Sequence, residues 1–339
     1  MTRFVYSEAD LLGKGTYAAV YAAVDTQGSL GKVALKRIDF DHMVEGCPLL
    51  LLREIGIARK LKHPNLVPVL AIQYSPLDGR ALIAFELLHC DLRQFLNRNG
   101  PLREQVLADA TLQLASGIDY MHSFGFLHRD LKPQNVLVAD PGTFNGSILV
   151  KIGDFGLARP YSPKLAKYTK EVMTLWYRCP ELLLGGHIYG PRGDCWGLGC
   201  LIGEMTCGVA MFSGESEVSV MFKIFKLLGT PSESVWPGVT QLCNFSPKFP
   251  KWTVSHSQRR EHLASFFETP LDTPKERLRS ALLFECVKER PVSHITRCII
   301  DVLEGLLCFL PANRLSAGQV KARVEKECAY SSPRLCVRD

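Results

Sequence analysis

The spacing of hydrophobic residues divides the chain into a strand-rich first part and a helix-rich remainder. Short apolar runs bounded by turn residues predict strands over 18–24, 32–38 and 81–85. One helix is expected between the second and third of these strands. It should begin at Pro48, since proline is favoured at the first helical position, and end near Leu61. The first part is therefore predicted to be a sheet with a single helix.

From Leu92 onward the hydrophobic residues recur at helical spacing. A short segment, residues 86–89, joins this part to the strand-rich one. Strands first and helices afterwards predict an α+β fold with two lobes, and small ligands commonly bind between such lobes. The clearest helical repeat consists of Val106, Leu107, Ala110, Leu114, Ile118 and Met121.

The composition is that of an ordinary globular protein. Of the 339 residues, 47% are hydrophobic and 22% are charged, which is enough apolar material for a packed core. The net charge of +6 comes from scattered basic residues, so no direct nucleic-acid binding is expected. No uninterrupted apolar run approaches the length of about 18 residues typical of a membrane-spanning helix. The twelve cysteines include no Cys-x-x-Cys pair and no apolar leader precedes them, so free thiols in the cytoplasm or nucleus are expected.

Two motifs carry the candidate chemistry. The first is His-Arg-Asp-Leu-Lys-Pro-Gln-Asn at 128–135, and the second is Asp-Phe-Gly, which begins 24 residues after Asp130. Phosphoryl transfer from ATP needs a carboxylate near the attacking hydroxyl and metal ions that neutralise the phosphates. Asp130 is the candidate carboxylate, while Asn135 and Asp154 are the candidate ligands of Mg²⁺.

A glycine-rich turn and a lysine-bearing strand could hold the phosphates of a nucleotide. The turn, Gly-Lys-Gly-Thr-Tyr at 13–17, lets backbone N–H groups approach phosphate oxygens without side-chain obstruction. Val-Ala-Leu-Lys at 33–36 has the form of a strand whose lysine contacts the α- and β-phosphates. Glu54, on the expected helix, is the candidate partner of Lys36.

With these motifs in this order, the chain resembles the eukaryotic protein kinases over roughly residues 4–325. Cys179-Pro180-Glu181 stands where the family carries Ala-Pro-Glu, and Asp194 begins a segment that resembles the brace of the catalytic loop. Glu181 is expected to form an ion pair with Arg314.

The resemblance implies the two-lobed protein kinase fold. Residues 1–88 would form a small β-rich N-lobe, with the helix at about 48–61 as its regulatory helix. Residues 89–326 would form a larger, mostly helical C-lobe that carries the activation segment, 154–181. Residues of about 253–295 do not match the family and are interpreted as an insertion with helices over 257–267 and 274–288, and 327–339 are expected to be a C-terminal tail.

The resemblance also implies roles for individual residues. Lys132, two residues after Asp130, marks serine/threonine kinases in the family and would place a positive charge near the transferred phosphoryl group. Thr174 resembles the threonine that hydrogen-bonds to the aspartate and lysine of that loop, so the catalytic set is Asp130, Lys132, Thr174, Lys36 and Glu54. The ATP-binding set is expected to consist of Leu12, Gly13, Gly15, Val20, Ala34, Lys36, Phe85, Glu86, Leu88, Asp91, Gln134 and Leu137.

Longer stretches resemble the cyclin-dependent kinases in particular. They include 85–92, 171–178 and 227–231, besides the glycine-rich turn and the catalytic loop. The helix before Glu54 differs most, because Pro48 is followed by four consecutive leucines. At 100° per residue they sweep about 300° and cannot all face one core. The resemblance implies that a cyclin-like activating partner covers some of them.

The same resemblance implies control by phosphorylation. Thr169 lies at the position of the activating phosphothreonine of the family. The phosphate would be held by three arginines from separate segments, Arg53, Arg129 and Arg159. Thr16 and Tyr17 match positions where phosphorylation is inhibitory, since added negative charge would repel the phosphates of ATP.

Protein substrates with Ser/Thr-Pro sites are expected, because Val172 and Arg178 resemble the positions that shape a pocket for proline. Two other interpretations fit part of the sequence. One is a kinase-fold scaffold that acts mainly through complex assembly, motivated by the leucine-rich helix and the insertion. The other is a mitogen-activated kinase, against which Thr169 argues, since those kinases carry a Thr-x-Tyr pair there.

Overall fold

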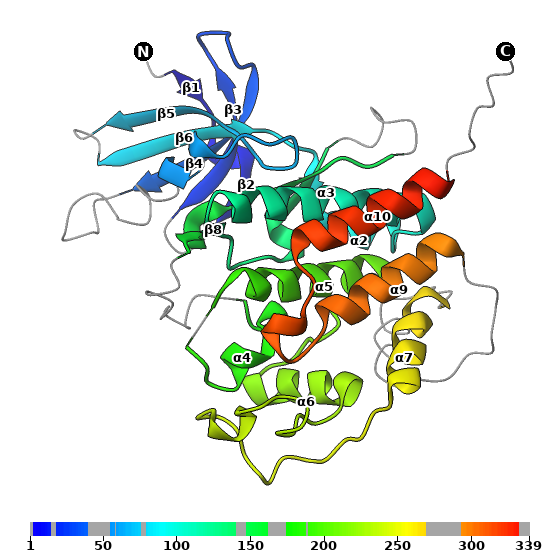
Figure 1. Ribbon diagram of the computed structural model, residues 1–339. Helices are drawn as coiled ribbons and strands as arrows, with labels where there is room; N and C mark the ends of the chain where they lie inside the picture. Colours follow the sequence, from blue (N-terminus) through cyan, green and yellow to red (C-terminus); the bar gives the residue numbers. More distant parts are fainter. Residues whose placement is uncertain are drawn as a thin grey trace, which may run out of the picture.

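The computed structural model describes residues 3–14, 18–39, 55–57, 59–75, 79–139, 147–161, 174–187, 189–268 and 293–331. Within these residues the chain forms a sheet followed by a helical region, seen at the top and bottom of Figure 1. This is the two-lobed kinase fold that the sequence predicts.

A six-stranded antiparallel sheet forms the N-lobe in the described part of the chain. Its path is β1-β3-β4-β6-β5, and β2 pairs with β3. The three strands predicted from the apolar runs are β3, β4 and β6, whereas β1, β2 and β5 were not predicted. The bounds are β1 Phe4–Val5, β2 Leu11–Lys14, β3 Ala19–Asp25, β4 Lys32–Asp39, β5 Val69–Ser75 and β6 Arg80–Glu86.

Alternation along β3 and β4 gives the sheet two different faces. Tyr21, Val33 and Leu35 are fully buried on one face, where Val33 and Leu35 pack with Phe4 of β1. Ala34, between Val33 and Leu35, and Lys36, after Leu35, lie on the other face and are half-buried. Residues 55–57 and 59–60 are helical, as predicted for this part of the chain.

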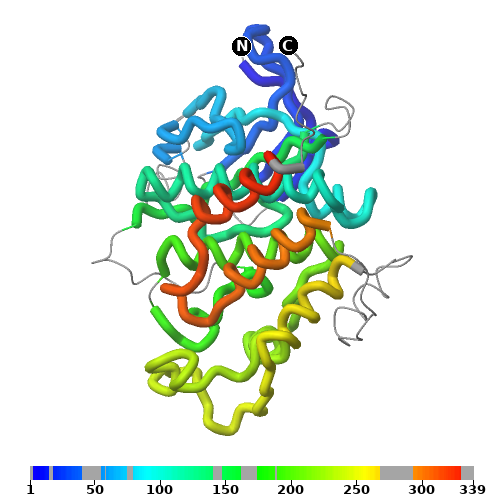
Figure 2. Tube along the Cα trace, turned by 45° about the vertical axis from the view of Figure 1, so that its right-hand side comes forward, coloured from blue at the N-terminus to red at the C-terminus, as the bar shows by residue number. Residues whose placement is uncertain are grey.

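The C-lobe is built from helices and two small sheets. One sheet has the order β10-β9-β7, and in the other β8 pairs with β11. In Figures 1 and 2 the long helix α3 lies next to the N-lobe with α10 beside it, and α6 lies farthest from the sheet. The bounds are β7 Cys90–Asp91, α2 Leu92–Asn99, α3 Glu104–Ser123, β8 Phe126–Leu127, β9 Val136–Val138, β10 Val150–Ile152, β11 Arg159–Pro160, α4 Pro180–Leu183, α5 Pro191–Cys207, α6 Glu217–Leu228, α7 His256–Glu268, α9 His294–Leu306 and α10 Ala317–Ser331.

The helical repeat read from the sequence is the buried face of α3. Five of its six residues are buried, and Val106 is partly buried against the same core. Helix α5 is buried on nearly all sides, as expected for a helix at the centre of a lobe. The predicted ion pair between Glu181 and Arg314 is present as two hydrogen bonds of 2.7 and 2.6 Å, and it joins α4 to the segment before α10.

Two boundaries differ from the sequence interpretation. Helix α10 runs to Ser331, so residues 327–331, assigned to the tail, continue a C-lobe helix. Helix α9 begins at His294, within the range assigned to the insertion. The first helix predicted there is α7, which buries Leu263 and Phe266 in the C-lobe core. The second predicted helix, over 274–288, lies outside the described residues.

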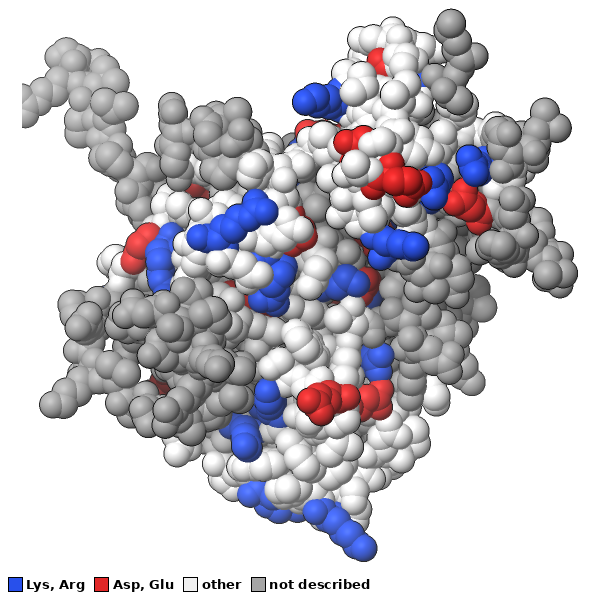
Figure 3. Space-filling model, turned by 180° about the vertical axis from the view of Figure 1, so that it is seen from behind, with Lys and Arg blue, Asp and Glu red and all other residues white. Residues whose placement is uncertain are grey.

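Other sequence expectations concern the surface and the thiols. All nine cysteines within the described residues are free. No helix in the described ranges combines the length and apolar character needed to cross a bilayer. On the face shown in Figure 3, basic side chains occur in several separate groups, with acidic side chains between some of them.

Candidate active site

One buried carboxylate, that of Asp194 on α5, holds the start of the catalytic loop in place. It accepts hydrogen bonds from the backbone N–H groups of His128 (2.9 Å) and Arg129 (2.8 Å), and from the Tyr189 hydroxyl (2.7 Å). The Nε2 atom of His122 lies 2.8 Å from the same carboxylate. Burial opposes ionisation of Asp194, but His122, His128 and the backbone donor outweigh it and lower the pKa of the carboxyl. The charged carboxylate therefore fixes the start of the loop.

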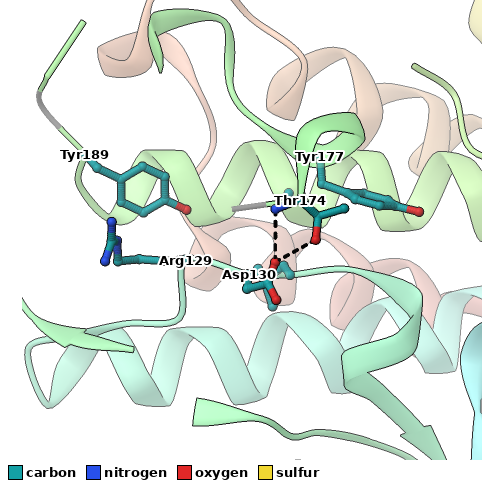
Figure 4. A pocket seen from close by; sticks show the side chains of 7 residues that line it. Arg129, Asp130, Thr174, Tyr177 and Tyr189 are labelled. Atoms are coloured by element: carbon teal, nitrogen blue, oxygen red, sulfur yellow. Dashed lines mark hydrogen bonds between the residues drawn. The ribbon is translucent and has the colours of Figure 1, made fainter. Parts of the chain in front are cut away.

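The loop residues that follow converge on the carboxylate of Asp130. Its Oδ1 atom accepts a hydrogen bond from the Thr174 hydroxyl at 3.0 Å, and its Oδ2 atom accepts from Lys132 Nζ at 2.6 Å and Asn135 Nδ2 at 2.9 Å. Lys132 also donates to the Thr174 hydroxyl at 3.1 Å. Figure 4 shows Thr174 directed at Asp130 from the neighbouring segment. Four residues singled out from the sequence are thus brought together.

Asp154 is placed beside this group by the backbone. The N–H of Gly153 donates to the carbonyl of Asn135 at 2.8 Å, and the next residue, Asp154, adopts a left-handed conformation with φ of 57°. Phe155 is buried, with its ring 5.8 Å from that of His128. The Asp154 side chain remains half exposed, and its Oδ1 atom lies 3.5 Å from Lys36 Nζ. This contact joins the N-lobe sheet to the catalytic loop region.

The environment of Asp154 favours its charged form. Enclosure by the protein tends to raise the pKa of the carboxyl, but the charges of Lys36 and His128 and the N–H of Gly156 outweigh it. The pKa of Asp154 is therefore below its ordinary value. A charged, half-exposed carboxylate is suited to hold a cation.

Strand register gathers the residues expected around the nucleotide into two groups. On the N-lobe sheet, Val20 lies opposite Lys36, and Ala34 lies opposite Phe85, so these four share the half-buried face. In the C-lobe, Leu137 lies opposite Asp91 in the β7–β9 pair. Leu137 lies next to Gly153, and the following residue, Asp154, contacts Lys36 of the N-lobe group.

The remaining predicted nucleotide residues are less enclosed or have other partners. Leu12 and Gln134 are exposed, and a Cβ on Gly13 would meet nothing within 4 Å. The side chain of Glu86 forms an ion pair with Lys151 of β10 at 2.5 Å, and Leu88 is half-buried. Asp91 has a role that the sequence did not reveal: its carboxylate caps α2 by accepting the Gln94 N–H at 2.8 Å.

Several predicted site residues, most of them regulatory, lie outside the described residues. Of the three arginines, Arg129 lies buried with its guanidinium over the ring of Tyr189, 5.9 Å from the centroid, and Arg159 lies on β11. The described residues do not include Gly15, Thr16, Tyr17, the leucines 49–52, Arg53, Glu54, Thr169 and Val172.

Sequence reasoning missed the buried polar side chains behind the site. Glu204 is fully buried in α5, and it accepts a hydrogen bond from Tyr177, which lies in the turn after Thr174. Glu204 is one of two carboxylates in the largely apolar helix α5, the other being Asp194, and an acidic residue in such a setting was the available signal. Tyr189, which anchors Asp194, gave no comparable signal.

Comparison with known proteins agrees with this geometry. Residues 6–324 match a family model described as "Protein kinase domain". Over 252 residues, the chain is 41% identical to "Cell division control protein 2 homolog 3" of Trypanosoma brucei brucei, with 73% of this chain and 78% of that protein covered. The chain therefore belongs to the protein kinase family, as a serine/threonine kinase of the cyclin-dependent type.

Proposed function

We propose that this kinase transfers the γ-phosphoryl group of MgATP to serine or threonine followed by proline, and that a cyclin-like subunit and phosphorylation of Thr169 activate it. The observation that carries the proposal is the convergence of Lys132, Asn135 and Thr174 on Asp130. Such a preoriented carboxylate can direct the attacking hydroxyl and accept its proton.

Each member of the group has a separate task. Asp130 orients the substrate hydroxyl, and Thr174 holds the carboxylate from the segment that would face the substrate. Lys132 lies within hydrogen-bonding distance of both and supplies positive charge where the phosphoryl group would pass. Lys36 would contact the phosphates from the N-lobe, since its ammonium lies next to Asp154.

The donor set fits Mg²⁺. This cation prefers oxygen ligands and is commonly held by one or two protein side chains together with the phosphates of the substrate. Asn135 uses its amide nitrogen to bond Asp130, so its carbonyl oxygen is the atom it can offer, and Asp154 offers a charged carboxylate. When bound, the cation would neutralise charge on the phosphates.

Dependence on a partner rests on the similarity to the cell division control protein homolog and on the four consecutive leucines, 49–52, which the sequence predicts to lie on a helix. A partner that covers two of the four leucines would gain roughly 1.5–3 kcal/mol for each one fully buried. Phosphate on Thr169 would then tie that helix, through Arg53, to Arg129 and Arg159 of the C-lobe. Activity in the cytoplasm or the nucleus is part of this proposal.

Preference for proline after the target residue rests on Val172 and Arg178. Arg178 is buried and forms an ion pair with Glu217 at the first residue of α6. This ion pair with α6 fixes the position of Arg178 directly after the Leu175–Tyr177 turn.

The test is transfer of labelled phosphate from MgATP to a Ser-Pro peptide and to a matched Ser-Ala peptide. The chain made alone is compared with the chain recovered from its native cells with bound partners. Transfer by the recovered complex only, with preference for Ser-Pro, is the expected result. Equal rates for the chain alone would overturn partner dependence, and equal use of the two peptides would overturn the proline preference.

A further inference from the structure

A buried charged group connects helix α2 to the turn that carries Thr174. The carboxylate of Glu204, on α5, has no exposed surface. One of its oxygens accepts a hydrogen bond from the Tyr177 hydroxyl at 2.7 Å, and the other is in contact with the guanidinium of Arg93 on α2. Arg93 also donates to the Tyr177 hydroxyl at 3.3 Å. The three side chains form a closed triangle, here called the 93–177–204 brace.

The brace ends at the catalytic group. Tyr177 is the last residue of a 3₁₀ turn, Leu175–Tyr177, whose N-cap is Thr174. That turn is closed by a hydrogen bond from the Arg178 N–H to the Leu175 carbonyl at 3.2 Å. In Figure 4 the ring of Tyr177 lies beside Thr174, and its hydroxyl points away from Asp130. Fixing the hydroxyl of Tyr177 therefore fixes the turn from which Thr174 reaches Asp130.

Stability alone does not explain this arrangement. A buried ion pair is often no more stabilising than apolar side chains of the same volume, because both charges lose their hydration. Hydrogen bonds to a buried carboxylate are directional, however, so they specify where each partner lies. A hydroxyl and a guanidinium from two other elements meet the same carboxylate, which is fully buried in the central helix α5.

We propose that Arg93, Tyr177 and Glu204 are positioning residues for phosphoryl transfer. The brace holds the Leu175–Tyr177 turn against α5, and thereby keeps Thr174 in register with Asp130 and Lys132. It acts on the segment that would face the protein substrate and leaves the nucleotide side of the site unchanged. The inference goes beyond the proposed function, because it requires neither a cyclin nor a phosphate on Thr169.

The test compares three variants with the wild-type kinase in its active complex. Tyr177→Phe keeps the ring and removes the hydroxyl, Arg93→Leu removes the charge, and Arg93→Lys retains it. Arg98→Leu makes the same chemical change at an exposed position of the same helix and serves as the control. Rates are measured against peptide and against ATP separately, and hydrogen exchange of the backbone amides is followed over residues 174–180.

Tyr177→Phe and Arg93→Leu are expected to lower kcat/KM for the peptide about tenfold or more, because small displacements of a catalytic group cost this much. The KM for ATP should stay within about twofold, since the ATP-binding residues keep their contacts. In these two variants, hydrogen exchange should accelerate over residues 174–180. Arg93→Lys should retain most of the wild-type kcat/KM for the peptide and most of the wild-type protection from exchange. Arg98→Leu should change neither kcat/KM nor exchange.

Other results would overturn the inference. A parallel rise in the KM for ATP, or a fall in thermal stability with unchanged exchange over 174–180, would show a general structural role. Failure of Arg93→Lys to recover activity would show that the charge at this position does not act through Glu204. An inactive wild-type chain would count against the proposed function, whereas the exchange measurement would still decide the inference.

Discussion

At the scale of single residues, the site depends on how the Asp130 carboxylate is oriented. Donors reach it from Lys132 and Asn135 within the loop and from Thr174 across the neighbouring segment. A side chain held from two directions does not have to be ordered when the substrate binds. This preorganisation is what a positioned general base contributes to catalysis.

Replacing Asp130 with asparagine tests this role. Asp130→Asn keeps the size of the side chain but removes the charge and the ability to accept a proton. We expect kcat to fall by roughly 10²–10⁴, the usual contribution of a positioned general base. Asp119→Asn makes the same change at a half-exposed position of α3 and should leave kcat unchanged. Near-normal turnover of the Asp130 variant would contradict the assignment.

At the scale of elements, paired charges join segments that are distant in sequence. In the N-lobe, the guanidinium of Arg3, before β1, binds the buried carboxylate of Asp25 at the end of β3, at 3.1 and 3.2 Å. Ser29 donates to the same carboxylate at 2.8 Å. In the C-lobe, Arg314 binds Glu181 and also donates to the carbonyl of Phe309 at 3.0 Å. These contacts hold the first strand and α4 in place.

The Asp25 contact predicts a pH dependence of stability. The hydrogen bonds from Arg3, followed by those from Ser29 and the Gln27 N–H, outweigh burial and lower the pKa of Asp25 to about 2. In the unfolded chain the pKa of an aspartate is about 3.9. The contribution of ionised Asp25 to the free energy of unfolding is therefore complete above about pH 4 and is lost as the pH falls toward 2. Urea unfolding should show that the wild-type protein is more stable than Asp25→Asn near pH 6. The difference between their free energies of unfolding should become smaller near pH 3. A difference in free energy of unfolding that does not change with pH would contradict the role assigned to ionised Asp25.

The Glu181–Arg314 pair predicts a large loss of stability when one partner is removed. Glu181→Leu leaves the buried guanidinium without its counter-charge, and we expect the free energy of unfolding to fall by about 3–5 kcal/mol. Removing both charges, with Arg314→Leu in the same chain, should recover part of the loss because no unpaired charge remains. Urea unfolding monitored by tryptophan fluorescence measures the free energies of unfolding of the single and the double variant, since Trp196 lies under the Arg314 guanidinium. A double variant as unstable as the single one would contradict the argument.

At the scale of the whole molecule, the proposed mechanism requires the two lobes to be in register. Lys36 belongs to the N-lobe sheet and Asp154 follows a strand of the C-lobe, and their contact is a direct link between the lobes among the described residues. In our proposal, the predicted regulatory helix and the activation segment are the parts of the chain through which a partner and a phosphate would act on this register. Our proposal of partner-dependent activity therefore belongs to this scale.

Replacing Thr169 tests the proposed control of that register. Thr169→Ala removes the hydroxyl that would carry the phosphate, so Arg53, Arg129 and Arg159 lose their common ligand. We expect activity to fall several-fold or more, measured as phosphate transfer by the complex recovered from cells. Ser162→Ala, a hydroxyl removed elsewhere in the activation segment, should have no such effect. A wild-type enzyme that is fully active without phosphate on Thr169 would contradict the mechanism.

The sequence alone determined the class of fold, the family and the position of α3, the longest helix among the described residues. The apolar repeat of α3 and the strands β3, β4 and β6 were readable because each pattern depends on neighbours along the chain. Strands β1 and β2 were missed because they are short and mostly exposed, and they become strands by pairing with β3.

Only the tertiary structure decided which buried polar groups meet. Tyr177 and Glu204 are 27 residues apart in sequence, and Arg93 and Tyr177 are 84 apart. Asp194 likewise collects donors from α3, the catalytic loop and the segment before α5. A buried charge needs a partner, but spacing along the chain does not say which one it is. The packing of α5 against its neighbours determines that choice, and the orientation of the catalytic loop follows from it.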